Sequence, residues 1–139
     1  MVFREADIKC GVYAKRSVAA WAKAVIEGHG KTVGEICVVS CSDEYLLGVN
    51  VEHLNHDYYT DIITFDYSEG ENVSGDLLIS FDRVRENAKD AGVSFQEELR
   101  RVIIHGCLHL VGFGDKTDAQ AIQMRKEENK GLIMFHVEQ

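Results

Sequence analysis

The spacing of hydrophobic residues predicts a helix followed by a strand in the first third of the chain. Across residues 15–28, Val18, Trp21 and Val25 recur at helical spacing and share one stripe. Residues 33–41 instead form a hydrophobic run rich in β-branched side chains, which is typical of a strand. The pattern therefore changes from helical to extended between these two segments.

A second helix and two strands are expected in the middle of the chain. Ser42 suits the N-cap of a helix that reaches past Asn50, because its hydroxyl can accept from a free backbone N–H at the helix start. Residues 60–67 and 73–81 favour strands on either side of a polar turn. The pattern leaves open whether these strands pair as a hairpin or only lie near one another.

Three further helices are expected in the last part of the chain. Residues 82–91 form a short helical pattern. Ser94 and Glu97 have the spacing of a capping box, and the helix that they begin carries most of the remaining hydrophobic residues. A weaker capping box at Thr117 opens a charged helix through about Lys130. The hydrophobic tail after it is compatible with docking or with fraying.

These elements predict one α+β domain over residues 1–139. A strand-rich middle between helical ends favours an α/β sandwich, in which a small mixed sheet of about four strands carries packed helices. Hydrophobic residues make up 45% of the chain, which is ordinary for a globular protein. We expect the helix that begins at Ser94 to be the buried central helix of this domain.

Composition narrows the cellular setting. The chain has a net charge of −8, a poor electrostatic match for a protein that binds nucleic acid unaided. No hydrophobic run approaches the roughly 18 residues of a membrane span, and the first residues lack the order of a signal peptide. We therefore expect a cytoplasmic protein with reduced cysteines. Cys37 and Cys41 should serve as packing residues, and Cys107 should point into the core.

The segment from His105 to Asp115 carries the strongest chemical signal in the chain. His105 and His109 are four residues apart, so on a helix both imidazoles project from one face and can bind one metal ion. Gly112 suits a turn at the helix end, which brings Asp115 back toward the same ion. Two imidazoles and one carboxylate leave a fourth position open, which is the pattern of a catalytic zinc site.

This segment has the layout of a metalloprotease helix and turn but lacks the general base. The glutamate of the His-Glu-x-x-His motif is replaced by Gly106, which argues against a standard peptidase mechanism. Two histidines and one carboxylate also bind iron in non-haem oxygenases. Such triads commonly lie on barrel strands, whereas here a helix and its turn carry the three residues, so we disfavour that alternative.

Three motifs together resemble those of the YbeY family, bacterial rRNA maturation factors described as metal-dependent endoribonucleases. The family's metal motif is His-Gly-x-Leu-His-Leu-x-Gly-x-x-[His/Asp], and it is matched from His105 to Asp115. The motifs occur in the family's order and span most of the chain. The other two are matched by Asn50 with residues 57–65, and by Gly75 with Asp76.

The resemblance implies a single-strand endoribonuclease that acts in small-subunit rRNA maturation and ribosome quality control. It implies one Zn²⁺, or another divalent ion, on His105, His109 and Asp115, with catalysis through that ion. The implied partners are ribosomal RNA or the ribosome, with help from a protein partner because the chain is acidic. Asp61 and Asp76 are candidates for a proton carrier or for a carboxylate behind the ligands, although Asp61 also suits a strand start and Asp76 a turn or bulge.

The chain departs from the family pattern at three positions. The third ligand, most often histidine in the family, is Asp115 here. Leu54 stands at the position of the family's arginine, and Tyr59 at the position of its proline. A non-catalytic ribosome-assembly factor with a structural metal therefore stays open, as does a metal-dependent hydrolase of another bond. Leu54 and the acidic charge favour the first of these alternatives, while Gly106 weighs against a peptide substrate.

The remaining histidines and tyrosines are expected to be structural. His29 should be exposed to solvent, and His53 should pack against its neighbours. Tyr58 and Tyr59 are expected at a strand edge of the core rather than as stacking surfaces for bases. Despite the acidic chain, the cleft around the metal should be neutral or positive once the ion is counted. The two other histidines, His56 and His136, are expected at the surface.

Overall fold

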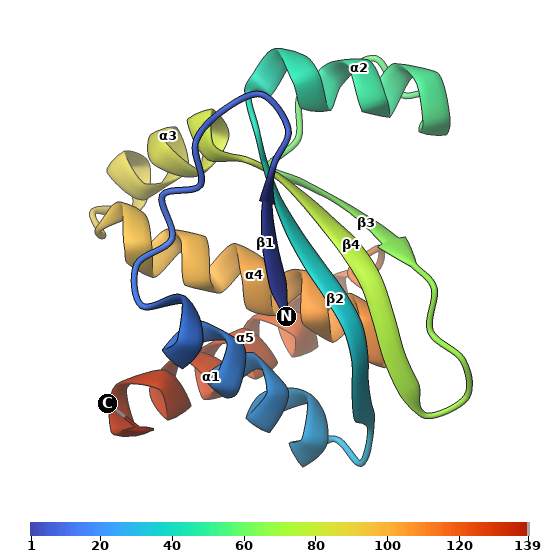
Figure 1. Ribbon diagram of the computed structural model, residues 1–139, viewed down its shortest axis with the longest axis vertical. Helices are drawn as coiled ribbons and strands as arrows, with labels where there is room; N and C mark the ends of the chain where they lie inside the picture. Colours follow the sequence, from blue (N-terminus) through green and yellow to red (C-terminus); the bar gives the residue numbers. More distant parts are fainter. Residues whose placement is uncertain (139) are drawn as a thin grey trace.

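The computed structural model describes residues 1–138, with side chains described for residues 1–135. Within that part, four strands form one sheet in the order β1-β2-β4-β3 (Figure 1). Strands β1 and β4 both run parallel to β2, whereas β3 is antiparallel to β4. The strands are β1 (Val2–Glu5), β2 (Thr32–Cys41), β3 (Ile62–Asp66) and β4 (Asn72–Ser80).

Helices cover one face of the sheet and one of its ends. The long helix α4 (Phe95–Val111) lies across β3 and β4, with α1 (Lys15–Gly28) and α5 (Asp118–Glu138) packed beside it (Figure 1). Helix α3 (Phe81–Ala91) follows β4 and packs on α4, while α2 (Asp43–Leu54) crosses the end of the sheet. The α+β prediction is confirmed.

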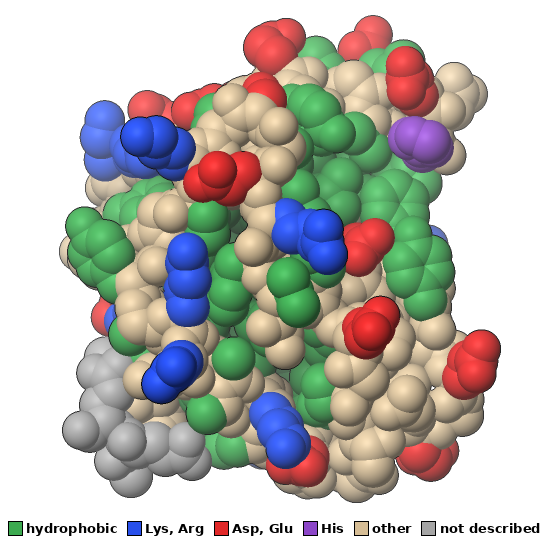
Figure 2. All heavy atoms as spheres, viewed as in Figure 1, with side chains coloured by type: hydrophobic (Ala, Val, Ile, Leu, Met, Phe, Trp, Pro, Cys, Tyr) green, Lys and Arg blue, Asp and Glu red, His purple; other side chains and the backbone are tan. Residues whose placement is uncertain are grey.

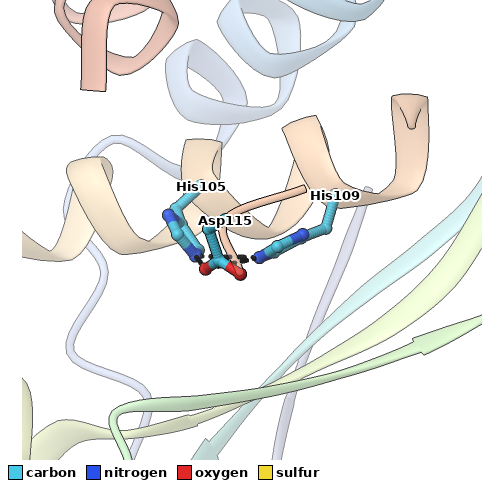
Figure 3. A group of neighbouring side chains, drawn as sticks. All are labelled: His105, His109 and Asp115. Atoms are coloured by element: carbon cyan, nitrogen blue, oxygen red, sulfur yellow. Dashed lines mark hydrogen bonds and ion pairs between the residues drawn. The ribbon is translucent and has the colours of Figure 1, made fainter. Parts of the chain in front are cut away.

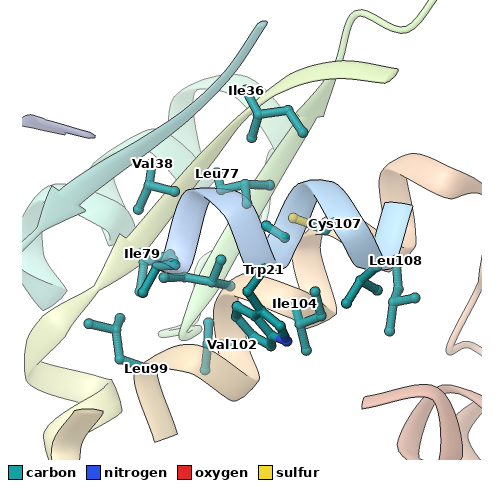
Figure 4. Close-up of a cluster of buried hydrophobic side chains, with 14 of the residues drawn as sticks. Trp21, Ile36, Val38, Leu77, Ile79, Leu99, Val102, Ile104, Cys107 and Leu108 are labelled. Atoms are coloured by element: carbon teal, nitrogen blue, oxygen red, sulfur yellow. The ribbon is translucent and has the colours of Figure 1, made fainter. Parts of the chain in front are cut away.

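The main core lies between α1, α4 and the covered face of the sheet (Figure 4). Trp21 of α1 is 1% exposed and donates from its indole Nε1 to the carbonyl of Gly131, at 2.6 Å. Its ring also meets Phe135 edge-on, with the centroids 5.3 Å apart. These contacts tie α5 to α1, so the hydrophobic tail docks at Leu132 and Phe135, both buried.

The opposite face of the sheet is open except where α2 crosses it. Charged side chains of both signs are interspersed on this face, and hydrophobic side chains gather beneath α2 (Figure 2). The second cluster of buried side chains lies here, with Cys41, Leu46 and Ile63 at its centre. Cys41 and Cys107 are buried as expected, but Cys37 is only half-buried on the open face.

Most predicted elements are confirmed, with two differences. Strand β1 was not predicted, because its four residues are mostly exposed and lack a hydrophobic alternation; it exists through parallel pairing with β2. Helix α5 continues well past Lys130. Gly131 lies inside this helix. A Cβ at Gly131 would lie 3.2 Å from Ile104, so glycine allows α5 to approach α4 closely.

The two strands β3 and β4 pair as an antiparallel hairpin, which settles the alternative left open by the pattern. Among the described residues, no helix is both long and hydrophobic enough to cross a membrane.

Candidate metal centre

Helix α4 positions both histidines of the candidate centre. The hydroxyl of Ser94 accepts from the backbone N–H of Glu97 at 3.1 Å, so the predicted N-cap is present. One face of the helix is buried, including Ile103 and Cys107. His105 and His109 project from another face, with side chains 23% and 27% exposed. The two imidazoles are therefore fixed by a packed helix yet accessible to a small ligand.

The turn after α4 brings the carboxylate of Asp115 to the two imidazoles (Figure 3). Gly112 caps the helix with a φ of 125°, a conformation that side chains rarely adopt. The Nε2 atoms of His105 and His109 are 3.0 Å apart, and Asp115 Oδ2 lies 3.3 and 3.2 Å from them. The predicted convergence of these three side chains is present in the structure.

Hydrogen bonds at the far side of each ring determine which nitrogens face inward. His109 Nδ1 is 2.9 Å from the carbonyl oxygen of Phe113, which can only accept, so Nδ1 carries the proton. His105 Nδ1 is 2.7 Å from Glu128 Oε2 and donates to that carboxylate. In the neutral rings, both Nε2 atoms therefore present lone pairs to one another and to Asp115.

This arrangement fits a divalent cation. Two nitrogen lone pairs and a carboxylate oxygen at these distances repel one another, and a cation among them replaces repulsion with coordination. A tetrahedral zinc ion with ligand bonds of 2.0–2.1 Å requires ligand atoms roughly 3.3–3.4 Å apart. The three separations of 3.0, 3.2 and 3.3 Å are close to that value, so the residues present need little movement to hold such an ion.

Glu128 of α5 completes the support of His105 and was not predicted. It is 5% exposed, and its other oxygen accepts from Arg101 at 2.9 Å. Burial favours the neutral acid, but the hydrogen bonds from His105 and Arg101 outweigh burial and lower the Glu128 pKa. In sequence, Glu128 is one of many charges on an apparently solvated helix, so no local signal distinguishes it.

The same carboxylate changes the proton affinity of His105. Burial opposes the charged imidazolium, but the hydrogen bond and charge of Glu128, with the charges of Asp115 and Asp61, raise the His105 pKa above its ordinary value of 6.5. A basic imidazole is a strong metal ligand once its proton is displaced. Glu128 therefore orients His105 and also increases its basicity.

The three ligand atoms lie in the wall of a cavity of about 540 Å³. Asp61, Asp66 and Asp115 line it, and Lys116 is the one lysine or arginine among the described lining residues. Three carboxylates and one ammonium give the lining a formal charge of −2, which one divalent cation would bring to zero. The expected neutral or positive cleft therefore depends on such an ion.

The structure separates the two additional acidic candidates. Asp61 lines the cavity with the histidines, and burial raises its pKa, although the charge of His105 opposes that effect. Asp76 does not approach this centre. It alternates with the buried residues Leu77 and Gly75 along β4 and lines a groove on the open face beside Cys37. The structure thus brings Asp61, but not Asp76, to the three ligands, and Asp76 is a strand residue rather than the turn or bulge residue considered.

Gly106 replaces the glutamate that serves as general base in metalloproteases, and it also lets helix α4 pack closely on the sheet. A Cβ at this position would lie 2.8 Å from Ile62 Cδ1 and 2.8 Å from Leu77 Cδ2. Helix α4 therefore lies close to the sheet where a metalloprotease would carry its glutamate. A side chain at this position would require Ile62 and Leu77 to move, which adds a steric argument against the peptidase arrangement.

Several structural expectations need correction. His29 is half-buried rather than exposed, because its ring meets Phe113 edge-on and its Nε2 lies 3.7 Å from Glu127. Tyr58 and Tyr59 do not belong to the core, since they are 55% and 48% exposed. His53 is exposed, although its ring does contact Phe65 edge-on.

The two surface histidines have different outcomes. His56 is exposed as expected and also lines the cavity, whereas the side chain of His136 lies outside the described residues.

Proteins of one known family match this chain over most of its length. The sequence model of a family described as "Endoribonuclease YbeY" matches residues 5–136. A Flavobacterium johnsoniae protein with the same description is 55% identical over 119 residues, covering 86% of both chains. A Parabacteroides distasonis protein, also named Endoribonuclease YbeY, is 50% identical and covers 93% of this chain and 91% of its own.

A solved structure supports the fold. The solution structure of a Thermotoga maritima protein superposes with a TM-score of 0.69, covering 99% of this chain and 91% of the other, at 23% sequence identity. Because the family model spans nearly the whole chain and relatives are about half identical to it, the chain belongs to the YbeY family.

Proposed function

We propose that this chain is a metal-dependent endoribonuclease that hydrolyses phosphodiester bonds of ribosomal RNA during its maturation. The observation that carries the proposal is the meeting of His105, His109 and Asp115 in the wall of an open cavity, with both histidine Nδ1 atoms already hydrogen-bonded. The names of the relatives supply the substrate class. Zinc is the ion that this donor set and spacing favour.

The ion would supply an activated water at neutral pH and would stabilise charge on a phosphoryl oxygen. The chain's own residues hold and orient what surrounds it. Glu128 and the carbonyl of Phe113 fix the two imidazoles, so that both Nε2 atoms face the same point. The turn at Gly112 places the Asp115 carboxylate opposite them. Preorganisation of this kind lowers the cost of assembling the reactive geometry.

Asp61 is the group that we assign to proton handling. It lines the cavity beside the ligands, on the segment that leads into β3, and its backbone carbonyl is held by the N–H of Ser80 at 2.9 Å. A buried carboxylate that gains a proton more readily than usual can accept one from an attacking water and later release it. Asp76 lies on the other face of the sheet and has no part in this assignment.

The alternatives are less well supported. A purely structural zinc site is normally closed by four protein ligands, whereas this centre offers three and adjoins a cavity. Hydrolysis of peptides is disfavoured because Gly106 lacks the usual glutamate, and a side chain there would displace Ile62 and Leu77. The non-haem iron alternative shares the donor set, and anaerobic metal analysis with an oxygen-uptake assay distinguishes it from a hydrolase.

The acidic charge of the chain bears on how RNA is recruited. With a net charge of −8 and one lysine in the described cavity lining, contacts to phosphates are few. Binding to naked RNA is therefore expected to be weak. The assembled ribosome or a protein partner would supply the remaining docking surface. We expect this binding to take place in the cytoplasm.

The test of the proposal is RNA cleavage by matched histidine variants. The wild type is assayed with zinc and after chelation, on single-stranded and duplex RNA. His109→Ala should stay folded and lose cleavage, while the control His53→Ala should retain it, because His53 is exposed and does not line the cavity. Asp115→Ala serves as a second variant, since its side chain is 40% exposed and contributes less to the core.

The outcomes separate the alternatives. A folded His109→Ala variant that still cleaves RNA like the wild type would end the endoribonuclease assignment at this site. Unfolding of both the His109 and Asp115 variants, restored by neither zinc nor substrate, would favour a structural metal instead.

A further inference from the structure

One wall of the cavity is formed by the segment that follows α2, and the metal centre does not use it. Leu54, His56 and Tyr58 all line the cavity that contains His105 and His109. Leu54 is 42% and Tyr58 55% exposed, and His56 is exposed as well. Apolar and aromatic surface is thus presented beside the ligands.

A buried asparagine fixes the shape of this wall. Asn50 is 2% exposed; its carbonyl oxygen accepts from the backbone N–H of His56 at 3.1 Å, and its side-chain Nδ2 donates to the carbonyl of Tyr58 at 3.0 Å. Asn55 ends α2 in the left-handed conformation with a φ of 55°. The segment is therefore wrapped around one buried side chain, so the positions of both rings are set before any ligand arrives.

The two rings form one stacked pair. The imidazole of His56 and the phenol of Tyr58 have centroids 5.2 Å apart and planes inclined by only 20°, and Tyr58 Oη lies 3.0 Å from His56 Nδ1. Tyr59 next to them differs. Its hydroxyl donates to Glu44 Oε1 at 2.6 Å, and Arg83 lies over its ring at 5.5 Å. Tyr59 thus has partners for both its ring and its hydroxyl within the chain, and it does not line the cavity.

We propose that His56 and Tyr58 form a stacking surface for one unpaired base of the RNA strand whose phosphodiester reaches the metal centre. The inference rests on the proposed function and adds the part of the substrate that is recognised. Every base has a flat π-face that stacks on aromatic rings, and a base offers that face to a protein only when it leaves a duplex. Because Lys116 is the one lysine or arginine in the described lining, stacking takes the larger share of binding here.

The inference is tested by binding of metal-free protein to two short single-stranded RNAs, measured by fluorescence anisotropy in the presence of chelator. One RNA carries all its bases, and the other is abasic at successive positions with the same phosphates. Wild type should bind the first more tightly. Tyr58→Ala should lose about 5- to 100-fold in affinity for it, with little change for the abasic strand. Tyr58→Trp should restore binding, and Tyr59→Ala is the matched control.

The outcomes of this experiment distinguish failure of the stacking surface from failure of the proposed function. Equal affinity of the wild type for the two strands, however weak, overturns the stacking surface, and so does a loss in Tyr59→Ala as large as in Tyr58→Ala. A wild type that prefers bases but never cleaves RNA with zinc keeps the stacking surface and removes the proposed function. Cleavage that survives with no effect of Tyr58→Ala does the reverse.

Discussion

Replacing Glu128 by glutamine tests how the protein prepares His105 for a metal. Glutamine has nearly the same shape, so its amide oxygen can still accept from His105 Nδ1, but the negative charge is lost. Arg101 and Arg125, which lie 2.9 and 3.3 Å from Glu128 Oε1, then face a neutral group. The change removes the charge that makes His105 a more basic ligand while it leaves the packing of α5 in place.

The expected magnitude follows from the position of Glu128 behind a ligand. Loss of such a partner typically lowers metal affinity about 10- to 100-fold, equivalent to roughly 1.4–2.7 kcal/mol. Glu128 should reach the upper part of this range, because it is buried and its 2.7 Å hydrogen bond to His105 is charge-assisted. The assay is competition with a chromophoric zinc chelator at several pH values.

The pH dependence of zinc binding should change in the direction opposite to the affinity. In the wild type, the raised pKa of His105 lets protons compete with the metal up to a higher pH. In Glu128→Gln the main cause of that rise is gone and burial lowers the pKa. The acid limb of zinc binding should therefore shift to lower pH, even though the limiting affinity at high pH falls. A substitution that only loosened the fold would not move the two quantities in opposite directions.

Glu127→Gln is the matched control for this experiment. Glu127 is also buried on α5, but its contacts are with His29 and Lys130 rather than with the ligands. Its replacement should leave both zinc affinity and the acid limb near the wild-type values. Identical behaviour of the two glutamine variants, or an unchanged acid limb in Glu128→Gln, would refute the orienting and charge-supplying role of Glu128.

Two further predictions concern stability. In metal-free protein, the His105–Glu128 pair should stabilise the fold fully between about pH 4.5 and 6.5, the ordinary pKa values of the two groups. This stability should decline as pH rises through the raised His105 pKa and as pH falls through the lowered Glu128 pKa. The difference in melting temperature between wild type and Glu128→Gln should therefore shrink above pH 6.5, and a difference that grows there would contradict the pairing. Gly106→Ala should lower the free energy of unfolding in urea by about 1–3 kcal/mol, because its methyl group meets Ile62 and Leu77. The control Gly48→Ala in α2, with nothing within 4 Å, should be neutral or stabilising by up to about 1 kcal/mol. Equal effects of the two substitutions would show that helix propensity, not the contact at Gly106, determines the change in stability.

Local patterns predicted the helices, most strands and the three ligands because each depends on short-range spacing. Ser94 and Gly112 mark the two ends of α4, and its two histidines are four positions apart. The support of the site could not be predicted in the same way. Glu128 reaches His105 only because α5 packs on α4, and Gly131 allows that packing because a Cβ there would lie 3.2 Å from Ile104, a residue distant in sequence.

Exposure was the other quantity that local patterns could not supply. Tyr58 and Tyr59 follow one another and have the composition of a strand edge, yet the strand begins only at Ile62. Asn50 belongs to one of the family's motifs, but the pattern does not show that the loop it shapes carries aromatic rings into the cavity. Strand β1 likewise depends on its partner β2 rather than on its own four residues.

The most direct test of the account is the coordination shell of the metal in protein purified without chelator, measured by X-ray absorption at the edge of the bound metal. We predict about one ion per chain, with two imidazole nitrogens at about 2.0–2.1 Å, oxygen ligands from Asp115 and solvent, and no sulfur. A sulfur shell at about 2.3 Å would place the ion on the cysteines, and the absence of stoichiometric metal would leave the three converging side chains without the cation on which the proposed chemistry depends.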